Sequence, residues 1–179
     1  MENKIAVIYK SKYGATKRYA GWIALKLGAD LYQVSDIGKN DLKEYDTIIY
    51  GGSIYTEKIK GVKFITSSYK NIKDKKIYVF MVGIKSFDEN YINYVLEKNI
   101  SKEILSNIDI FYFRGKINYK ELSMKDKILI NSLKLDVLDN QETDILNDDK
   151  MIFELSNSSI DCIDKKSIDR LLNSVLSNG

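Results

Sequence analysis

The residues with the clearest chemistry lie together in one short loop near the start of the sequence: Ser11, Lys12, Tyr13, Gly14, Ala15 and Thr16. Ser11 and Thr16 supply hydroxyl groups, and Gly14 lets the backbone approach a ligand closely. A helix pattern begins at Thr16, and the amino end of a helix favours an anion because its first N–H groups are free. The loop therefore predicts a site for a phosphate monoester. An ordinary strand-to-helix turn, with Thr16 as the N-cap, is the alternative.

Two other classes of nucleotide-binding loop do not fit this segment. A dinucleotide-binding loop needs a second glycine two residues from the first, and no glycine stands two residues before Gly14. A Walker A loop ends in Gly-Lys-Thr or Gly-Lys-Ser, and neither sequence follows here. Both classes are therefore excluded for this loop.

A second candidate loop contains two glycines and an aromatic residue: Gly51, Gly52, Ser53, Ile54 and Tyr55. It follows an apolar run at 47–50, which we expect to be a strand that ends abruptly at the glycines. The backbone could turn there and place its amides beside a flat ring, on which Tyr55 could stack. In the alternative interpretation the glycines only permit the turn, and Tyr55 packs against Tyr50 or the next helix.

A third candidate loop lies within 82–91 and could supply the opposite wall of the same site. Its candidate contacts are Val82, Gly83, Ile84 and Phe87. Element boundaries are the least reliable part of any interpretation of sequence patterns. Phe87 and Tyr91 could therefore equally belong to the helix that follows.

Strand and helix patterns alternate along the chain. Apolar runs predict strands at 3–9, 31–34, 47–50, 76–82 and 110–113. Helical periodicity predicts helices at 16–27, 62–72, 91–108 with a break near Asn99, 124–135 and 163–176. The alternation predicts a single α/β domain over residues 1–179, with a parallel sheet covered by helices on both faces. Ligands of such sheets bind at the carboxyl ends of the strands, where the three candidate loops lie.

The composition is that of a globular protein, with 44% hydrophobic and 30% charged residues. The sequence has no histidine, which removes the usual general base and the commonest metal ligand. Any chemistry must therefore depend on a cofactor or on carboxylates, and we predict no metal site. The net charge of +3 is spread along the chain without a dense arginine-rich block, so we do not expect nucleic acid binding.

The sequence also indicates a cellular compartment. The longest strongly apolar run, at 77–84, is too short for a helix that crosses a bilayer. Cys162 is the only cysteine, so no internal disulfide can form, which suits a reducing environment. We expect a cytoplasmic protein with at most peripheral contact with the inner face of a membrane.

Several motifs together resemble a known family. They are Ser-x-x-Gly-x-Thr at 11–16, Tyr-Asp-x-Ile-Ile-x-Gly-x-Ser-Ile at 45–54 and the succession of five strands. These features are similar to flavodoxin-like proteins, and among those to the flavodoxin-type, menaquinone-dependent protoporphyrinogen oxidases. A basic and aromatic helical segment at 118–135 and a Glu-Thr-Asp sequence at 142–144 resemble that subgroup as well. The likeness covers most of residues 3–144.

The resemblance implies a three-layer flavodoxin-like sandwich with a parallel sheet of order 2-1-3-4-5 and a helical insert at roughly 116–150. It implies noncovalently bound FMN, with the three candidate loops as its contacts, and electron transfer to a redox partner protein or a quinone. A porphyrinogen is a candidate substrate. Two departures matter: Tyr13 stands where a second threonine is usual, and the C-terminal part lacks the tryptophan-containing segment of the oxidases.

Three functions stay open: an FMN-dependent oxidoreductase, a flavodoxin-type single-electron carrier, and a binding domain that has lost FMN. An oxidase acting on a large planar substrate needs a wall beside the flavin, which the segment at 118–135 could supply. We expect its helix, at 124–135, to direct Ile128, Leu129 and Leu133 inward. It could rest on a membrane surface, although amphipathic helices ordinarily pack on the core. The basic residues in and next to this segment would suit a substrate that carries carboxylates: Lys116, Lys120, Lys125 and Lys127.

Overall fold

The computed structural model describes residues 3–139 and 159–177, with the side chains of 132–139 outside that description. Its main sheet contains five parallel strands, and their sheet order is β2-β1-β3-β5-β6. The strands are β1 (Ile5–Lys10), β2 (Asp30–Gln33), β3 (Thr47–Tyr55), β5 (Lys76–Gly83) and β6 (Asp109–Arg114). This order confirms the predicted 2-1-3-4-5 sheet, because β4 (Lys58–Ile59) is a short hairpin strand beside β3 that the prediction did not count.

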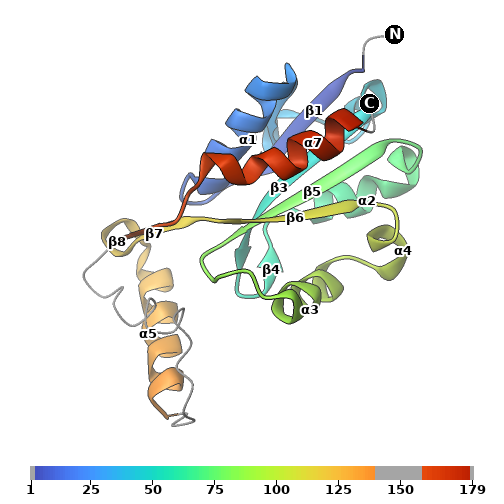
Figure 1. Cartoon of the computed structure of the whole chain (residues 1–179). Helices are drawn as coiled ribbons and strands as arrows, with labels where there is room; N and C mark the ends of the chain where they lie inside the picture. Colours follow the sequence, from blue (N-terminus) through green and yellow to red (C-terminus); the bar gives the residue numbers. More distant parts are fainter. Residues whose placement is uncertain (1–2, 140–158, 178–179) are drawn as a thin grey trace.

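Helices cover both faces of the sheet and form the outer layers of the sandwich (Figure 1). One face carries α1 (Ala15–Leu27) and α7 (Asp169–Ser177), and the other carries α2 (Lys63–Ile72), α3 (Glu89–Asn99) and α4 (Lys102–Leu105). The central strands are buried on both sides because each right-handed crossover lays its helix on the sheet. Two separate apolar clusters result, one on each face of the sheet.

The first helix illustrates how local sequence positions the loop before it. Its apolar stripe, which includes Tyr19, Ala20 and Ile23, is fully buried against the sheet. The helix begins after Gly14 and ends at Gly28, and both glycines have positive φ angles, of 87° and 61°. Glycine adopts this left-handed conformation at little cost, so the two residues set the ends of the helix.

The remaining predicted helices are present with shifted ends. The break predicted near Asn99 is confirmed, because α3 ends there and α4 follows. The Asn99 side chain accepts a hydrogen bond from Ile59 N (3.0 Å) and donates one to Glu57 O (2.7 Å), which fastens the hairpin of β4 (Lys58–Ile59) to the end of α3. Short 3₁₀ helices lie at Val34–Asp36, Asp41–Glu44, Tyr119–Glu121 and Lys165–Ile168.

The structure corrects the prediction that the third strand ends at residue 50. β3 continues through Gly51 and Gly52 to Tyr55, and both glycines are buried and paired with β1 and β5. A side chain at Gly51 would collide with the ring of Phe80, and one at Gly52 would collide with Lys60 O. The glycines therefore serve close packing inside the sheet, not a turn at its edge.

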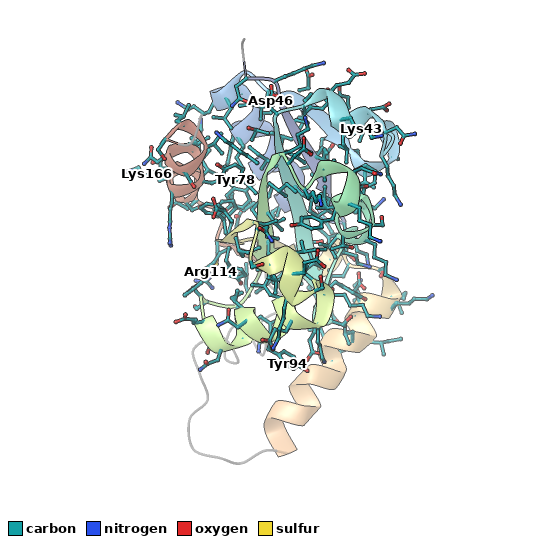
Figure 2. The ribbon with its side chains drawn as sticks, turned by 90° about the vertical axis from the view of Figure 1, so that its right-hand side faces the viewer. Lys43, Asp46, Tyr78, Tyr94, Arg114 and Lys166 are labelled. Atoms are coloured by element: carbon teal, nitrogen blue, oxygen red, sulfur yellow. The ribbon has the colours of Figure 1, made fainter. Side chains whose placement is uncertain are left out.

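The insert after β6 contains β7 (Lys116–Asn118), α5 (Met124–Asp139) and β8 (Ser159–Asp161). β7 and β8 pair antiparallel in a small second sheet, and α5 projects from the body of the molecule beside it (Figure 1). Figure 2 shows Lys43 and Asp46 at one end of the molecule, with Arg114 and Tyr94 toward the other end, from which α5 extends. No helix in the described ranges is long and apolar enough to cross a membrane.

The structure also corrects the orientation predicted for the insert helix. Ile128, expected to face inward, is 65% exposed, whereas Ile130 is buried. Leu129 lies in the wall of a cavity, as described below. Leu133 and Lys134, and the segment at 142–144, lie outside the described side chains and residues.

Candidate functional site

A cavity of about 180 Å³ lies at the carboxyl ends of β1, β3 and β5. Most residues of the three candidate loops line this cavity: Ser11, Lys12, Tyr13, Ala15, Thr16, Ser53, Ile54, Tyr55, Val82, Gly83 and Ile84. The remaining lining residues come from the hairpin and the insert: Thr56, Gly115, Lys116, Ile117, Leu122, Asp126, Leu129 and Ile130. The edge of the sheet predicted to carry the site is therefore hollow.

The Ser11–Thr16 loop has the features of an anion-binding site, and its most buried hydroxyl, that of Thr16, makes no hydrogen bond within the described residues. Ser11 Oγ accepts a hydrogen bond from Gly14 N (3.1 Å), which folds the loop back on itself. Thr16 is fully buried, and its Oγ1 atom has no hydrogen-bond partner within the described residues. The first turn of α1 contains no acidic residue and no capping side chain. An uncapped helix end beside an unsatisfied hydroxyl fits a phosphate group.

Gly14 stands at the turn of this loop but does not line the cavity. A Cβ at this position would meet no atom within 4 Å, so the described chain leaves space for a side chain. The requirement for glycine comes from the positive φ of 87°.

The second loop is the hairpin between β3 and β4. Thr56 and Glu57 form its turn with positive φ angles of 45° and 60°, a conformation that is strained for a β-branched residue. Tyr55 lies just before this turn, and its ring has the ammonium groups of Lys12 and Lys60 at 4.6 and 4.5 Å from its centroid. The Tyr55 hydroxyl donates to Asp126 of the insert.

The third loop follows β5 and is held by the neighbouring strand. Gly115 N donates to Gly83 O (2.7 Å), and the guanidinium of Arg114 donates to Ile84 O (3.2 Å). A side chain at Gly83 would collide with the hydroxyl of Tyr112. Backbone pairing with β6 therefore fixes the wall made by Gly83 and Ile84.

Besides Gly14, three predicted site residues do not line the cavity. Gly51 and Gly52 are buried inside β3, as described above. Phe87 is 67% exposed, and its ring lies 6.2 Å from the ring of Tyr112 between centroids. Phe87 precedes the N-cap of α3, Asp88, whose carboxylate accepts from Tyr91 N (2.8 Å). Phe87 therefore lies on the surface just before α3 and outside the cavity.

The most strongly bonded side chain of the site is one that the sequence patterns did not single out. Asp126, in the first turn of α5, is only 3% exposed. Its carboxylate accepts hydrogen bonds from Lys12 Nζ (2.5 Å), from the Tyr13 hydroxyl and from the Tyr55 hydroxyl. We call Asp126 with these three donors the Asp126 cluster.

The contacts of the Asp126 cluster shift the pKa values of Asp126, Lys12 and Tyr55. Burial by itself raises the pKa of the Asp126 carboxyl, but the hydrogen bonds from its lysine and tyrosine partners outweigh burial and hold that pKa below its ordinary value. The hydrogen bond between Lys12 and Asp126 raises the pKa of the Lys12 ammonium. The hydrogen bond between Tyr55 and Asp126 raises the pKa of the Tyr55 hydroxyl. At neutral pH the Asp126 carboxyl is therefore charged, Lys12 is an ammonium and the Tyr55 phenol is neutral.

One sequence signal could have revealed Asp126. Leu122 stands four positions before Asp126, and Leu129 and Ile130 stand three and four positions after it; all four line the cavity. A carboxylate on such an apolar stripe is unusual unless it is paired. The prediction missed this pattern because it placed Ile128 on the inward face together with Leu129 and Leu133, whereas Ile128 is exposed.

Comparison with known proteins identifies the family. Similar solved structures include a flavodoxin from the domain Archaea, with 18% identity, 69% of this chain and 87% of that chain covered, and a TM-score of 0.45. Oxidised Flavodoxin 2 from Bacillus cereus has 18% identity, covers 61% of this chain and 84% of its own, and has a TM-score of 0.43. Two-electron reduced Megasphaera elsdenii flavodoxin has 17% identity and a TM-score of 0.45, and the match covers 60% of this chain and 84% of that chain.

No protein with curated functional information matches the sequence. The family model described as "Flavodoxin domain" matches residues 6–144, which is more than half of the chain. Apart from Ile5 at the start of β1, this range contains the five parallel strands of the main sheet, and it contains all three candidate loops. The chain therefore belongs to the flavodoxin domain family.

Proposed function

We propose that this chain is an electron-transfer flavoprotein that holds FMN in the cavity at the carboxyl ends of its strands. The observation that supports this proposal most strongly is the state of the Thr16 hydroxyl. It is buried at the start of α1, in a residue that lines the cavity, and it has no hydrogen-bond partner within the described residues. A buried hydroxyl without a hydrogen bond is costly, and a phosphate oxygen would satisfy it. FMN, the cofactor of this family, supplies the redox chemistry when bound.

The chain itself would bind and orient the cofactor. Ser11, Thr16 and the first amides of α1 are placed to hold a phosphate. Tyr13 does not take the role of a second phosphate hydroxyl, because its hydroxyl donates to Asp126. Tyr55 and the backbone of Gly83 and Ile84 would flank the flat ring, in line with their positions in the cavity wall.

The insert supports a more specific function, that of an FMN-dependent oxidoreductase acting with a flat, apolar partner. Leu122, Leu129 and Ile130 form an apolar wall on one side of the cavity, which a simple carrier with an exposed flavin edge does not need. A quinone is an acceptor of this chemistry, and a porphyrinogen is a candidate donor whose carboxylates Lys116 could meet. A flavodoxin-type single-electron carrier is the second candidate, because the loops alone suffice for it.

The outer face of α5 suggests where a quinone would be met. Met124 and Ile128 are 72% and 65% exposed, and Lys125 and Lys127 lie between them in the sequence. Apolar side chains beside lysines suit the surface of an anionic membrane. Sedimentation with vesicles containing anionic lipid should retain the chain, and Met124→Glu should weaken that retention. Wild-type protein that stays in the supernatant would contradict the proposed binding of α5 to a membrane surface.

The experiment that tests the function starts with purified protein and FMN. Reconstituted protein should be yellow, and under anaerobic conditions its flavin should be reducible and then reoxidised by a menaquinone analogue. Leu129→Gln should slow reoxidation by the quinone, because it makes the apolar wall polar, whereas Leu25→Gln should not, because Leu25 is 79% exposed on α1 and does not line the cavity. Protoporphyrinogen is then offered as the reductant.

Each outcome selects one function. Flavin reduction by protoporphyrinogen and reoxidation by the quinone support the oxidoreductase. Slow reaction with both, together with rapid exchange with small one-electron donors, supports the carrier. A colourless protein that takes up no added FMN contradicts both redox functions and leaves a binding domain that has lost the cofactor.

A further inference from the structure

The Asp126 cluster joins three segments that lie far apart in the sequence. Lys12 and Tyr13 belong to the phosphate loop, Tyr55 ends β3, and Asp126 belongs to the insert. Lys12 and Asp126 are separated by 114 positions in the sequence. The carboxylate therefore ties the insert to two of the loops that form the cavity.

The Asp126 carboxylate does not fill the place of a phosphate. Its hydrogen bonds go to the long side chains around the loop, whereas the deepest hydroxyl of the loop, that of Thr16, keeps no partner within the described residues. The first turn of α1 likewise has no side-chain cap. A carboxylate that competed with the phosphate would satisfy these groups. Asp126 thus lies beside the anion site and leaves it open.

The cluster is also electrically balanced. Asp126 is the only acidic side chain among the described residues that line the cavity, and it is paired with Lys12 at 2.5 Å. A buried carboxylate left alone would repel both a phosphate and a reduced flavin, but the ammonium partner cancels most of its field at a distance. The pairing allows the chain to place an organising carboxylate next to an anionic ligand.

We propose that Asp126 is a positioning residue of the cofactor site, whose carboxylate holds the donor side chains of both loops in the arrangement that receives the flavin. The proposal rests on the proposed binding of FMN. Fixed side chains lower the ordering cost of binding, so the site is organised before the ligand arrives. Because the cluster orients Tyr13 and Tyr55 and does not touch Thr16, it supports the ring end of the cofactor more than its phosphate.

The test compares FMN with riboflavin, which lacks the phosphate, by quenching of flavin fluorescence. Asp126→Asn and Asp126→Ala should each raise the Kd of both ligands by about tenfold, as expected for the loss of hydrogen bonds to a charged group. Glu121→Gln is the matched control, because it removes a carboxylate from the same insert at an exposed position outside the cavity, and it should change neither Kd.

A second measurement separates positioning from general loosening of the fold. Asp126→Asn leaves the Lys12 ammonium without its carboxylate beside the flavin, so the midpoint potential of the bound flavin should shift to a more positive value, because reduction adds negative charge. Lys12→Met combined with Asp126→Asn should return the potential toward the wild-type value. A purely structural defect would not be reversed by removing the second charge.

The outcomes decide the proposal and the proposed function separately. Wild-type protein that binds FMN while the Asp126 variants bind both flavins equally well overturns the role of Asp126 and leaves the flavoprotein function intact. Tighter FMN binding by Asp126→Asn, with riboflavin unchanged, would also overturn it, because Asp126 would then be a competitor of the phosphate. Wild-type protein that binds neither flavin overturns both. If Asp126→Ala does not fold, Asp126→Asn and its double variant decide the outcome.

Discussion

The ring of Phe80 in β5 covers Gly51, the residue directly beside it in β3. Phe80 is fully buried and lies 5.4 Å, between ring centroids, from Phe113 in β6. The ring occupies the space that any side chain at Gly51 would need. The close packing of the central strands under α1 and α7 therefore depends on Gly51, which the sequence analysis assigned to a candidate loop of the site.

This packing predicts that Gly51→Ala destabilises the fold by about 1–3 kcal/mol, because an added methyl group overfills the core. Chemical denaturation followed by circular dichroism measures the change. Gly21→Ala is the control: its Cβ would meet no atom within 4 Å, and it lies inside α1, so alanine should stabilise by about 0.5–1 kcal/mol. Equal effects of the two substitutions would contradict the packing argument.

Gly14→Ala is predicted to affect both stability and cofactor binding. The positive φ of 87° should cost an alanine about 1–2 kcal/mol of unfolding free energy. Gly28→Ala, at the opposite end of the same helix with a φ of 61°, should cost a similar amount. Only Gly14→Ala should also weaken FMN binding, since only Gly14 shapes the phosphate loop. A comparable loss of FMN affinity in Gly28→Ala would attribute the effect to α1 as a whole.

Thr16→Val is predicted to separate binding from stability. The substitution keeps the shape of the side chain and removes a hydroxyl that bonds to nothing within the described residues, so unfolding free energy should stay the same or rise slightly. The Kd for FMN should rise about tenfold or more, since a hydrogen bond to a charged phosphate is lost. Riboflavin binding should not change.

Thr47→Val provides the matched control for that experiment. Thr47 is equally buried at the opposite end of β3, where its hydroxyl donates to Asn3 Oδ1 (3.2 Å). This substitution should lower stability because it leaves Asn3 without that donor, yet it should leave the Kd for FMN unchanged. If both threonine variants lost FMN affinity alike, the phosphate assignment of Thr16 would be wrong.

The Asp126 cluster predicts a defined pH dependence of stability. A carboxyl whose pKa is lowered by folding contributes stability above its ordinary pKa of 3.8 and loses it as the pH falls through the lower, folded pKa. The contribution of Lys12, whose pKa is raised, is complete below its ordinary 10.5 and is lost as the pH rises through the higher, folded pKa. Between these limits the cluster contributes fully.

The unfolding free energies of the wild type and Asp126→Asn should therefore differ by about 1–3 kcal/mol, and the difference should be constant from about pH 5 to 9. It should shrink as the pH falls below about 4. Urea titrations at several pH values measure it. Asp74→Asn serves as the comparison, because the Asp74 side chain is 70% exposed and should show little difference at any pH. A difference that grew in acid would contradict the lowered pKa of Asp126.

The sequence by itself determined the class of the fold and singled out the Ser11–Thr16 loop as the candidate phosphate site. Strand and helix patterns depend on residues close together in the chain, such as the buried run of β1 and the stripe of Tyr19, Ala20 and Ile23 in α1. The Ser11–Thr16 loop is equally local, because its hydroxyls, its glycine and the following helix end are contiguous. Parallel strands then bring successive loops to one edge of the sheet, so the position of the cavity follows from topology.

Only the tertiary structure decided what the glycines at 51 and 52 do and which residue of the insert faces the cavity. Gly51 is explained by Phe80 in another strand, and Asp126 by donors in two distant loops. Such contacts form after the strands and helices have packed, so the patterns along a single segment cannot contain them. In the sequence, two adjacent glycines in a turn cannot be distinguished from two glycines packed under an aromatic ring. Likewise, a helical aspartate such as Asp126 is expected to be exposed unless its hydrogen-bond donors on other segments are known.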